Sequence, residues 1–132
     1  MKNPSRTVAG VVFAILTFVL VTRSAVAQDA AKVDPKHYKV EFENDQVRTL
    51  RISLGPHEKS VMHEHPAGVV VFLTDGTGKF TYPDGKTEEI GWKAGQVLSL
   101  PAVKHLPENL TDKPLELIQV ELKVKEAKTE KK

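Results

Sequence analysis

The sequence predicts an all-β fold in a single domain. Strand-like segments recur between residues 37 and 122, turn signals rich in Gly, Pro and Asp separate them, and no segment in this range carries helical periodicity. Val47–Leu54 shows the alternation of apolar and polar residues that a strand with one buried face requires. Short strands with turns at regular intervals are typical of a β-sandwich or a β-barrel.

The first 27 residues have the pattern of a signal peptide. Lys2 and Arg6 precede an apolar stretch at residues 8–21, and Ala25-Val26-Ala27 forms a small-x-small cleavage site. The apolar stretch is shorter than the roughly 20 residues that span a membrane, so no stable membrane insertion is expected after cleavage. A leader kept as an N-terminal anchor is the alternative. We therefore expect a periplasmic or secreted protein.

The remainder is expected to form one domain in three segments: a flexible lead-in at residues 28–40, the barrel at 41–123 and a flexible charged tail at 124–132. Loss of the leader removes three of the 19 basic residues and leaves 16 against 17 acidic ones. Because no basic patch is evident, no nucleic-acid partner is expected. The chain has no cysteine, which excludes thiolate ligands and nucleophiles.

Strands are predicted at residues 37–42, 47–54, 69–73, 96–100 and 115–124, and a hairpin joins residues 78–82 to 86–90 through Pro83-Asp84-Gly85. The apolar residues of 115–124 change phase near Ile118, which predicts a β-bulge. Residues 69–73 are continuously apolar, so we expect them to be buried on both faces. One of these faces would pack against a second subunit in a homodimer.

Histidines are the candidate metal ligands. His63 and His65 are two residues apart, so on a strand their side chains project from the same face. If the sheet curls so that the strands face each other, His105 joins them and three imidazoles converge. Three neutral nitrogen ligands suffice for one divalent transition metal (iron, manganese, nickel, copper or zinc) with open coordination positions. The alternative is that the pair are surface histidines or partly buried polar groups.

Four neighbouring polar residues are expected to have other roles. Glu64 lies between the two histidines, points to the opposite face and is expected to pair with a lysine. His57, in a turn, and His37, near the start of the domain, are expected at the surface. Glu108 is either a carboxylate that orients an imidazole or an exposed loop charge. No motif points to another catalytic site, so catalytic residues stay unassigned and no organic cofactor is expected.

Two spaced motifs, within about residues 43–123, resemble those of the small single-domain cupins. The first cupin motif consists of glycine, a spacer, His-x-His, three or four residues, glutamate, six residues and glycine. Here His63-Glu64-His65 is followed after three residues by Val69 and after six more by Gly76. Val69 thus stands where the family has its glutamate ligand, and valine cannot coordinate a metal.

The second cupin motif consists of glycine, five residues, Pro-x-Gly, two residues, histidine, three residues and asparagine. Gly95, Pro101, His105 and Asn109 match it, although Val103 replaces the motif glycine and the proline-to-histidine spacing is one residue short. The resemblance implies a jelly-roll β-barrel that holds a metal in its mouth. It makes His63, His65 and His105 the expected ligands, and gives Asn109 a structural or ligand-supporting role.

The missing carboxylate has two interpretations. The site is either a three-histidine metal centre, as in some cupin dioxygenases, with Val69 forming an apolar wall beside an open coordination position, or a degenerate site. We therefore expect an exported cupin that binds one divalent transition metal and, if it is an enzyme, is a dioxygenase-like oxidoreductase acting on a small organic anion. Any proton transfer would involve water, Glu108 or the substrate. The alternative is a non-catalytic module that binds a small molecule or has a structural role.

Overall fold

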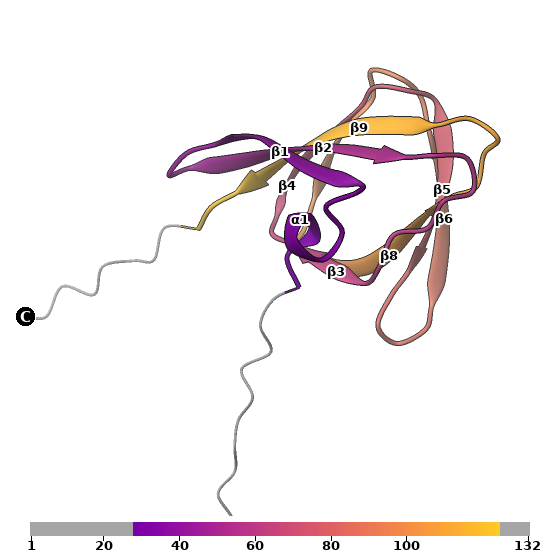
Figure 1. Ribbon diagram of the computed structural model, residues 1–132, viewed down its shortest axis with the longest axis horizontal. Helices are drawn as coiled ribbons and strands as arrows, with labels where there is room; N and C mark the ends of the chain where they lie inside the picture. Colours follow the sequence, from indigo (N-terminus) through magenta and orange to yellow (C-terminus); the bar gives the residue numbers. More distant parts are fainter. Residues whose placement is uncertain (1–27, 125–132) are drawn as a thin grey trace, which may run out of the picture.

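The computed structural model describes residues 28–124, which form two antiparallel sheets that curl around a common interior (Figure 1). The five-stranded sheet has the order β1 (Tyr38–Glu43), β2 (Val47–Leu54), β9 (Leu115–Leu122), β4 (Gly68–Phe72) and β7 (Val97–Leu100). The four-stranded sheet has the order β3 (His63–His65), β8 (Val103–Asn109), β5 (Gly76–Thr81) and β6 (Thr87–Trp92). The predicted all-β jelly-roll is confirmed. The predicted signal peptide at 1–27 and residues 125–132 of the predicted tail lie outside the described residues.

Residues 28–37 are ordered, in contrast to the flexible lead-in that we expected. They contain a short helix, α1 (Ala30–Val33), whose first turn is capped by the side chain of Asp29, which accepts from the backbone N–H of Lys32 at 3.2 Å. Ala30 is fully buried in the core. The backbone N–H of Glu64 donates to the carbonyl of Gln28 at 2.8 Å, so this segment lies along the outer edge of β3.

The inner face of the five-stranded sheet supplies most of the core. Leu50, Ile52 and Leu54 of β2 are all buried, as their alternation predicts. β2 pairs with β9 over eight consecutive residues without a register shift, so the bulge predicted near Ile118 is wrong. The irregularity lies instead in β1, between residues 40 and 42.

Only one face of β4 belongs to the core. Val70 and Phe72 are buried, whereas Val69 points to the outer face, where it pairs with Val120 of β9. The expectation that this strand is buried on both faces is therefore wrong, and Leu73 just beyond it is 41% exposed. The homodimer that we inferred from this strand stays a prediction.

An aromatic stack joins the two sheets. Trp92 of β6 stacks on Phe72 of β4, with ring centroids 4.5 Å apart and an interplanar angle of 22°. The indole lies so close to Gly76 and Gly78 of β5 that a Cβ at either position would crowd it. The first-motif glycine at 76 is thus explained by packing, because only glycine leaves room for the tryptophan ring.

Asn109 fixes two loops at one end of the barrel. Its side chain is fully buried, and its Nδ2 donates to the carbonyls of Gly55 at 2.9 Å and Lys113 at 2.8 Å. Its Oδ1 accepts from the backbone N–H of Thr111 at 2.9 Å. Asn109 has no hydrogen bond to a histidine among the described residues, so its contacts are those of a structural residue.

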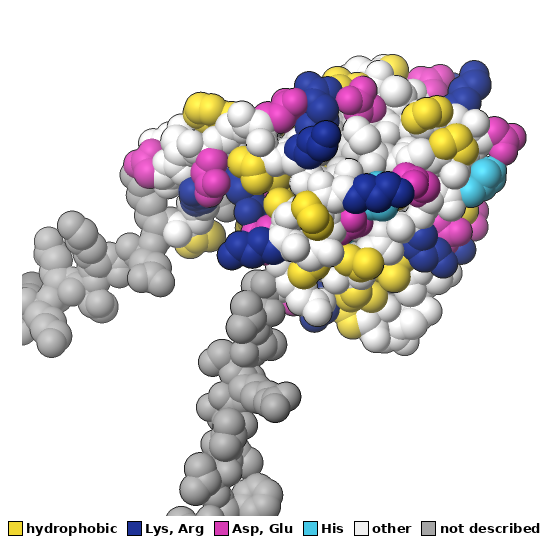
Figure 2. Space-filling model, in the orientation of Figure 1, with side chains coloured by type: hydrophobic (Ala, Val, Ile, Leu, Met, Phe, Trp, Pro, Cys, Tyr) yellow, Lys and Arg dark blue, Asp and Glu magenta, His cyan; other side chains and the backbone are white. Residues whose placement is uncertain are grey.

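Charged side chains are spread over the surface. On the face in Figure 2, lysine and arginine alternate with aspartate and glutamate, and no large patch of one sign is visible. Within residues 28–124, the helical part of the chain is too short to cross a membrane.

Gly68 provides a test of how tightly β4 packs against β9. A methyl group at Gly68 would overlap the backbone carbonyl of Val120, which the paired strands cannot move apart to relieve. We expect Gly68→Ala to lower the free energy of unfolding by about 2 kcal/mol, measured by urea denaturation. Gly91→Ala is the control, because a methyl group there would lie 3.7 Å from its nearest neighbour; its effect should stay within about 0.5 kcal/mol. Equal losses in both variants would contradict the crowding argument.

Candidate metal centre

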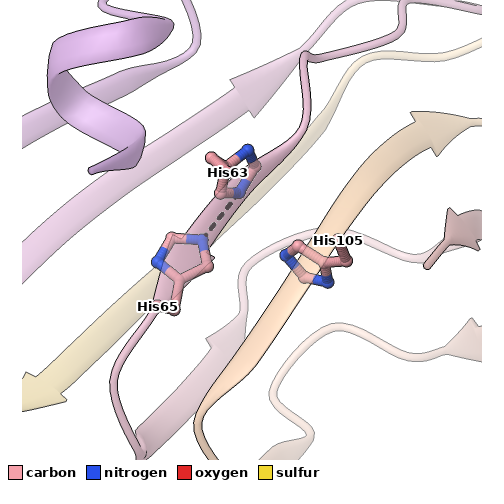
Figure 3. A group of neighbouring side chains, drawn as sticks. All are labelled: His63, His65 and His105. Carbon is pink, nitrogen blue, oxygen red and sulfur yellow. Dashed lines mark hydrogen bonds between the residues drawn. The ribbon is translucent and has the colours of Figure 1, made fainter. Parts of the chain in front are cut away.

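Three buried histidines meet on the inner side of the four-stranded sheet. β3 and β8 are antiparallel neighbours in which His63 and His105 are direct cross-strand partners, and His65 follows on the same face (Figure 3). One nitrogen from each ring lies within 4.8 Å of the other two, so the group could hold a metal ion. The predicted convergence of His63, His65 and His105 is therefore confirmed as geometry.

Glu64 and His57 have the surroundings that the sequence predicts. Glu64 points away from the histidine cluster and pairs with Lys104 at 3.2 Å. The His57 side chain is 61% exposed.

His37 is not at the surface as expected. It is buried, with Nδ1 2.7 Å from Asp34 Oδ2 and Nε2 3.0 Å from Glu58 Oε2. Burial opposes ionisation of Asp34, but its hydrogen bonds with Ser60 and His37 lower its pKa below the usual value. His37 thus ties the segment after α1 to the loop before β3, and it belongs to the scaffold of the site.

The hydrogen bonds of His63 and His65 determine where their lone pairs point. His63 Nδ1 lies 2.7 Å from the carbonyl oxygen of Val61, and His65 Nδ1 lies 2.6 Å from Oε1 of Glu121. A carbonyl and an ionised carboxylate can only accept, so both Nδ1 atoms carry the proton. In the neutral imidazoles, both Nε2 atoms then present a lone pair.

These two lone pairs face each other across 2.9 Å, the separation of His63 Nε2 and His65 Nε2 (Figure 3). Two acceptors this close repel each other unless a proton or a metal ion lies between them. Burial and the neighbouring His65 lower the pKa of His63 to about 4, and burial and His63 lower that of His105 to about 3, so these two imidazoles are neutral near neutral pH. The residues present therefore fit a divalent cation bound by neutral imidazoles.

A chain of buried and partly buried charges supports His65. Burial alone would raise the pKa of Glu121, but the hydrogen bonds from His65 and Arg48 lower it below the usual value, so the carboxylate stays ionised. Arg48 Nε donates to Glu121 Oε2 at 2.6 Å, and Arg48 Nη1 donates to Asp29 Oδ2 at 2.5 Å. A carboxylate behind a ligating histidine fixes the tautomer and raises the basicity of the imidazole.

Sequence reasoning missed Glu121, although a signal for it exists. If the alternation that begins at Leu115 continues without interruption, then Leu117, Gln119 and Glu121 share the inner face, and the structure places them there. The apolar residues at Val120 and onward suggested a phase change instead. A polar pair on an inner face is the feature that could have pointed to the site.

The other predicted pocket residues occupy different places. Val69 faces outward, and Val70, one residue later, lines the cavity. The cupin motif allows three or four residues between the histidine pair and its glutamate, and both spacings place a valine at the glutamate position here. Glu108 pairs with Lys79 at 2.9 Å and has no hydrogen bond to a histidine among the described residues. It borders the cavity, but Glu121 is the residue that orients an imidazole.

A cavity of about 340 Å³ opens next to the histidines. His65 and His105 form part of its wall, and Phe80 stacks on His105 with ring centroids 5.3 Å apart. This volume is at the lower end of the range for pockets that bind small organic ligands. A metal held by the histidines would therefore face a space that a small molecule can enter.

Glu121→Gln tests the support of His65. The amide cannot accept from both His65 and Arg48 with the strength of a carboxylate, so we expect metal affinity to fall roughly 10- to 100-fold. Titration of the metal-free protein with zinc or nickel, followed by calorimetry, measures the change. Glu108→Gln is the matched control, since Glu108 contacts lysines only, and its affinity should equal that of the wild type. A normal affinity in Glu121→Gln would refute this role.

The buried histidines also make the metal-free protein sensitive to acid. His63 and His105 have folded pKa values of about 4 and about 3, against an ordinary value of 6.5. Below about pH 6.5 these histidines are protonated in the unfolded chain but stay neutral in the folded chain. The free energy of unfolding therefore falls with pH, by at most about 1.4 kcal/mol per pH unit for each histidine. Carboxylates with a lowered pKa, such as Glu121, contribute their loss only below their usual value of 4.5.

Urea unfolding at about pH 7 and about pH 5 therefore isolates the histidines. His105→Phe keeps the stack on Phe80 and should reduce the loss of unfolding free energy between these pH values. His57→Ala, at an exposed position, should leave the loss unchanged. Equal stability of the wild-type protein at both pH values would contradict the neutral state assigned to the cluster.

Comparison with solved structures shows the same fold in several bacterial proteins. A cupin domain protein of Bordetella pertussis superposes with a TM-score of 0.62 at 24% identity, covering 66% of this chain and 92% of that chain. A Bacillus halodurans protein gives a TM-score of 0.53 at 17% identity, covering 68% and 72%. A Klebsiella pneumoniae protein described as having a double-stranded β-helix domain gives 0.51 at 18% identity, covering 67% and 84%. At these identities the likeness shows the fold alone.

No match was found among curated proteins. The family model of the cupin domain, in contrast, matches residues 50–121. This range contains the histidine pair of β3, the histidine of β8 and the carboxylate of β9 that supports them. The chain belongs to the cupin family.

Proposed function

We propose that this protein binds one divalent transition metal through His63, His65 and His105 and is an oxygen-dependent oxidoreductase acting on a small organic anion. The observation that carries the proposal is that His63 Nε2 and His65 Nε2 face each other at 2.9 Å, each with a lone pair. In each ring, the Nδ1 atom donates a hydrogen bond, which leaves Nε2 without a proton in the neutral imidazole. A metal ion bound by both nitrogens would satisfy both lone pairs. The metal would be iron, manganese, nickel, copper or zinc, since imidazole suits all of them.

When bound, such a metal supplies Lewis acidity and, for redox-active ions, an electron-transfer route for dioxygen chemistry. The chain itself contributes three neutral ligands, so the full charge of the ion remains available to attract an anionic oxygen of the substrate. Phe80, Val70 and Leu98 line the adjoining cavity with apolar surface. Both oxygens of the Glu121 carboxylate already accept hydrogen bonds, one from His65 and one from Arg48, so Glu121 is not free to act as a base.

A non-catalytic binding module is the second candidate, and one observation favours it. The carboxylates that border the cavity are already engaged, Glu88 by the hydroxyl of Tyr82 and Glu108 by Lys79. With no free general base among the described residues of the wall, the cavity could hold a ligand without changing it. Export to the periplasm or the medium is proposed from residues 1–27 alone.

Elemental analysis of the protein purified without an affinity tag is the first test. We expect about one equivalent of a transition metal in the wild type and none in the double variant His63→Ala/His65→Ala. Glu64→Ala, on the opposite face of the same strand, should keep its metal. Absence of metal from the wild type, together with no binding on titration, would refute the proposal. If metal is present, oxygen consumption with a panel of small organic anions separates the enzyme from the binding module.

A further inference from the structure

The cavity beside the histidines has an apolar wall. Apart from the histidine end, its surface is formed mainly by aliphatic and aromatic side chains of both sheets, among them Leu54, Val70, Phe72, Phe80, Ile90 and Leu98. Such a wall binds the body of a ligand through the release of water from apolar surface. A polar ligand of the same size would lose its hydration without compensation.

The charges around this cavity limit the ligand further. No lysine or arginine lies among the described residues that line it, so an anionic group remote from the histidines would have no cationic partner. Glu108 pairs with Lys79 at 2.9 Å, and Glu88, which accepts from the Tyr82 hydroxyl at 2.8 Å, is exposed to solvent that screens its charge. A ligand charge, if present, therefore belongs at the histidine end.

Gln119 is a polar side chain in the mainly apolar wall. Gln119 of β9 is 4% exposed and lines the cavity, and its amide has no hydrogen bond among the described residues. Its cross-strand neighbours are Leu50 and Val70, which offer no donor or acceptor from their side chains. An amide that faces a cavity without a hydrogen-bond partner from the protein is available to a polar group of a ligand.

We infer that Gln119 recognises the ligand, and that the ligand is a largely apolar molecule carrying an uncharged hydroxyl or carbonyl group for this amide, in addition to the anionic oxygen that the metal would attract. The amide can both donate and accept, so it can bind either group. Gln119 precedes Glu121 by two residues on the same inner face, which places the recognised group toward the histidine end of the cavity. This inference rests on the proposed function, since it names the ligand class of the same site.

Three naphthalene derivatives of similar size test the inference: 2-naphthol, 2-methylnaphthalene and naphthalene-2-sulfonate. We expect the metal-free wild type to bind 2-naphthol roughly tenfold more tightly than 2-methylnaphthalene, which is about the value of one hydrogen bond, and the sulfonate more weakly than either. Fluorescence titration of the probes measures this. Because metal is absent, a failure here is distinct from a failure of the proposed metal site, which metal analysis reports separately.

Gln119→Met removes the amide at nearly constant length and should abolish the preference for 2-naphthol while keeping affinity for 2-methylnaphthalene. The variant should also unfold at higher urea concentration, because an unpaired amide has been replaced by an apolar chain. Gln119→Leu serves as a second variant, and the exposed Gln46→Leu is the matched control, which should retain the preference. An unchanged preference in both Gln119 variants, tight binding of the sulfonate, or failure of the wild type to bind either neutral probe would overturn the inference.

Discussion

The hydrogen bond between His65 and Glu121 is the interaction on which the site depends. A carboxylate as deeply buried as Glu121 stays ionised only because His65 and Arg48 both donate to it. In return it fixes the proton of His65 on Nδ1 and leaves the Nε2 lone pair directed at His63. Arg48 extends the chain to Asp29, the cap of α1, so the segment with α1, β2, β9 and β3 are held in one network. Removal of one member would leave a buried charge without a partner, which is costly.

The inner face of β9 divides the interior into two environments. Leu115, Leu117 and Gln119 line the cavity in turn, and Glu121 follows on the same face in contact with His65. Because alternate residues of one strand are about 7 Å apart, this change from apolar to polar occurs over little more than one ligand ring. A bound molecule thus has a defined orientation, with its apolar body toward Leu115 and its oxygen atoms toward the histidines.

The same strand explains what the sequence could and could not predict. Alternation identified the inner face of β2 through Leu50 and Ile52, because apolar residues there have no competing role. On β9 the inward residues become polar at Gln119. The apolar pattern therefore predicts a β-bulge, although the pairing of β9 with β2 is continuous. β8 was not predicted as a strand, because Pro107 interrupts its pattern, yet it pairs with both β3 and β5. The histidines were predictable because their spacing alone determines their face. Their partner Glu121 was not, since it is 56 residues away from His65 and only the tertiary fold brings them together.

The missing ligand carboxylate has a physical counterpart in Glu121. A glutamate in the coordination sphere would reduce the charge of the metal directly, whereas Val70 leaves that position open and apolar. Glu121 still places a negative charge one imidazole away, at the far nitrogen of His65, where it strengthens the ligand without occupying a coordination position. Arg48 lies between Glu121 and Asp29 and pairs with both, so the three groups together carry a net charge of −1. A metal bound by the histidines would keep much of its attraction for an anionic oxygen, because an imidazole separates it from this carboxylate, and the cavity beside the histidines has room for an apolar ligand body.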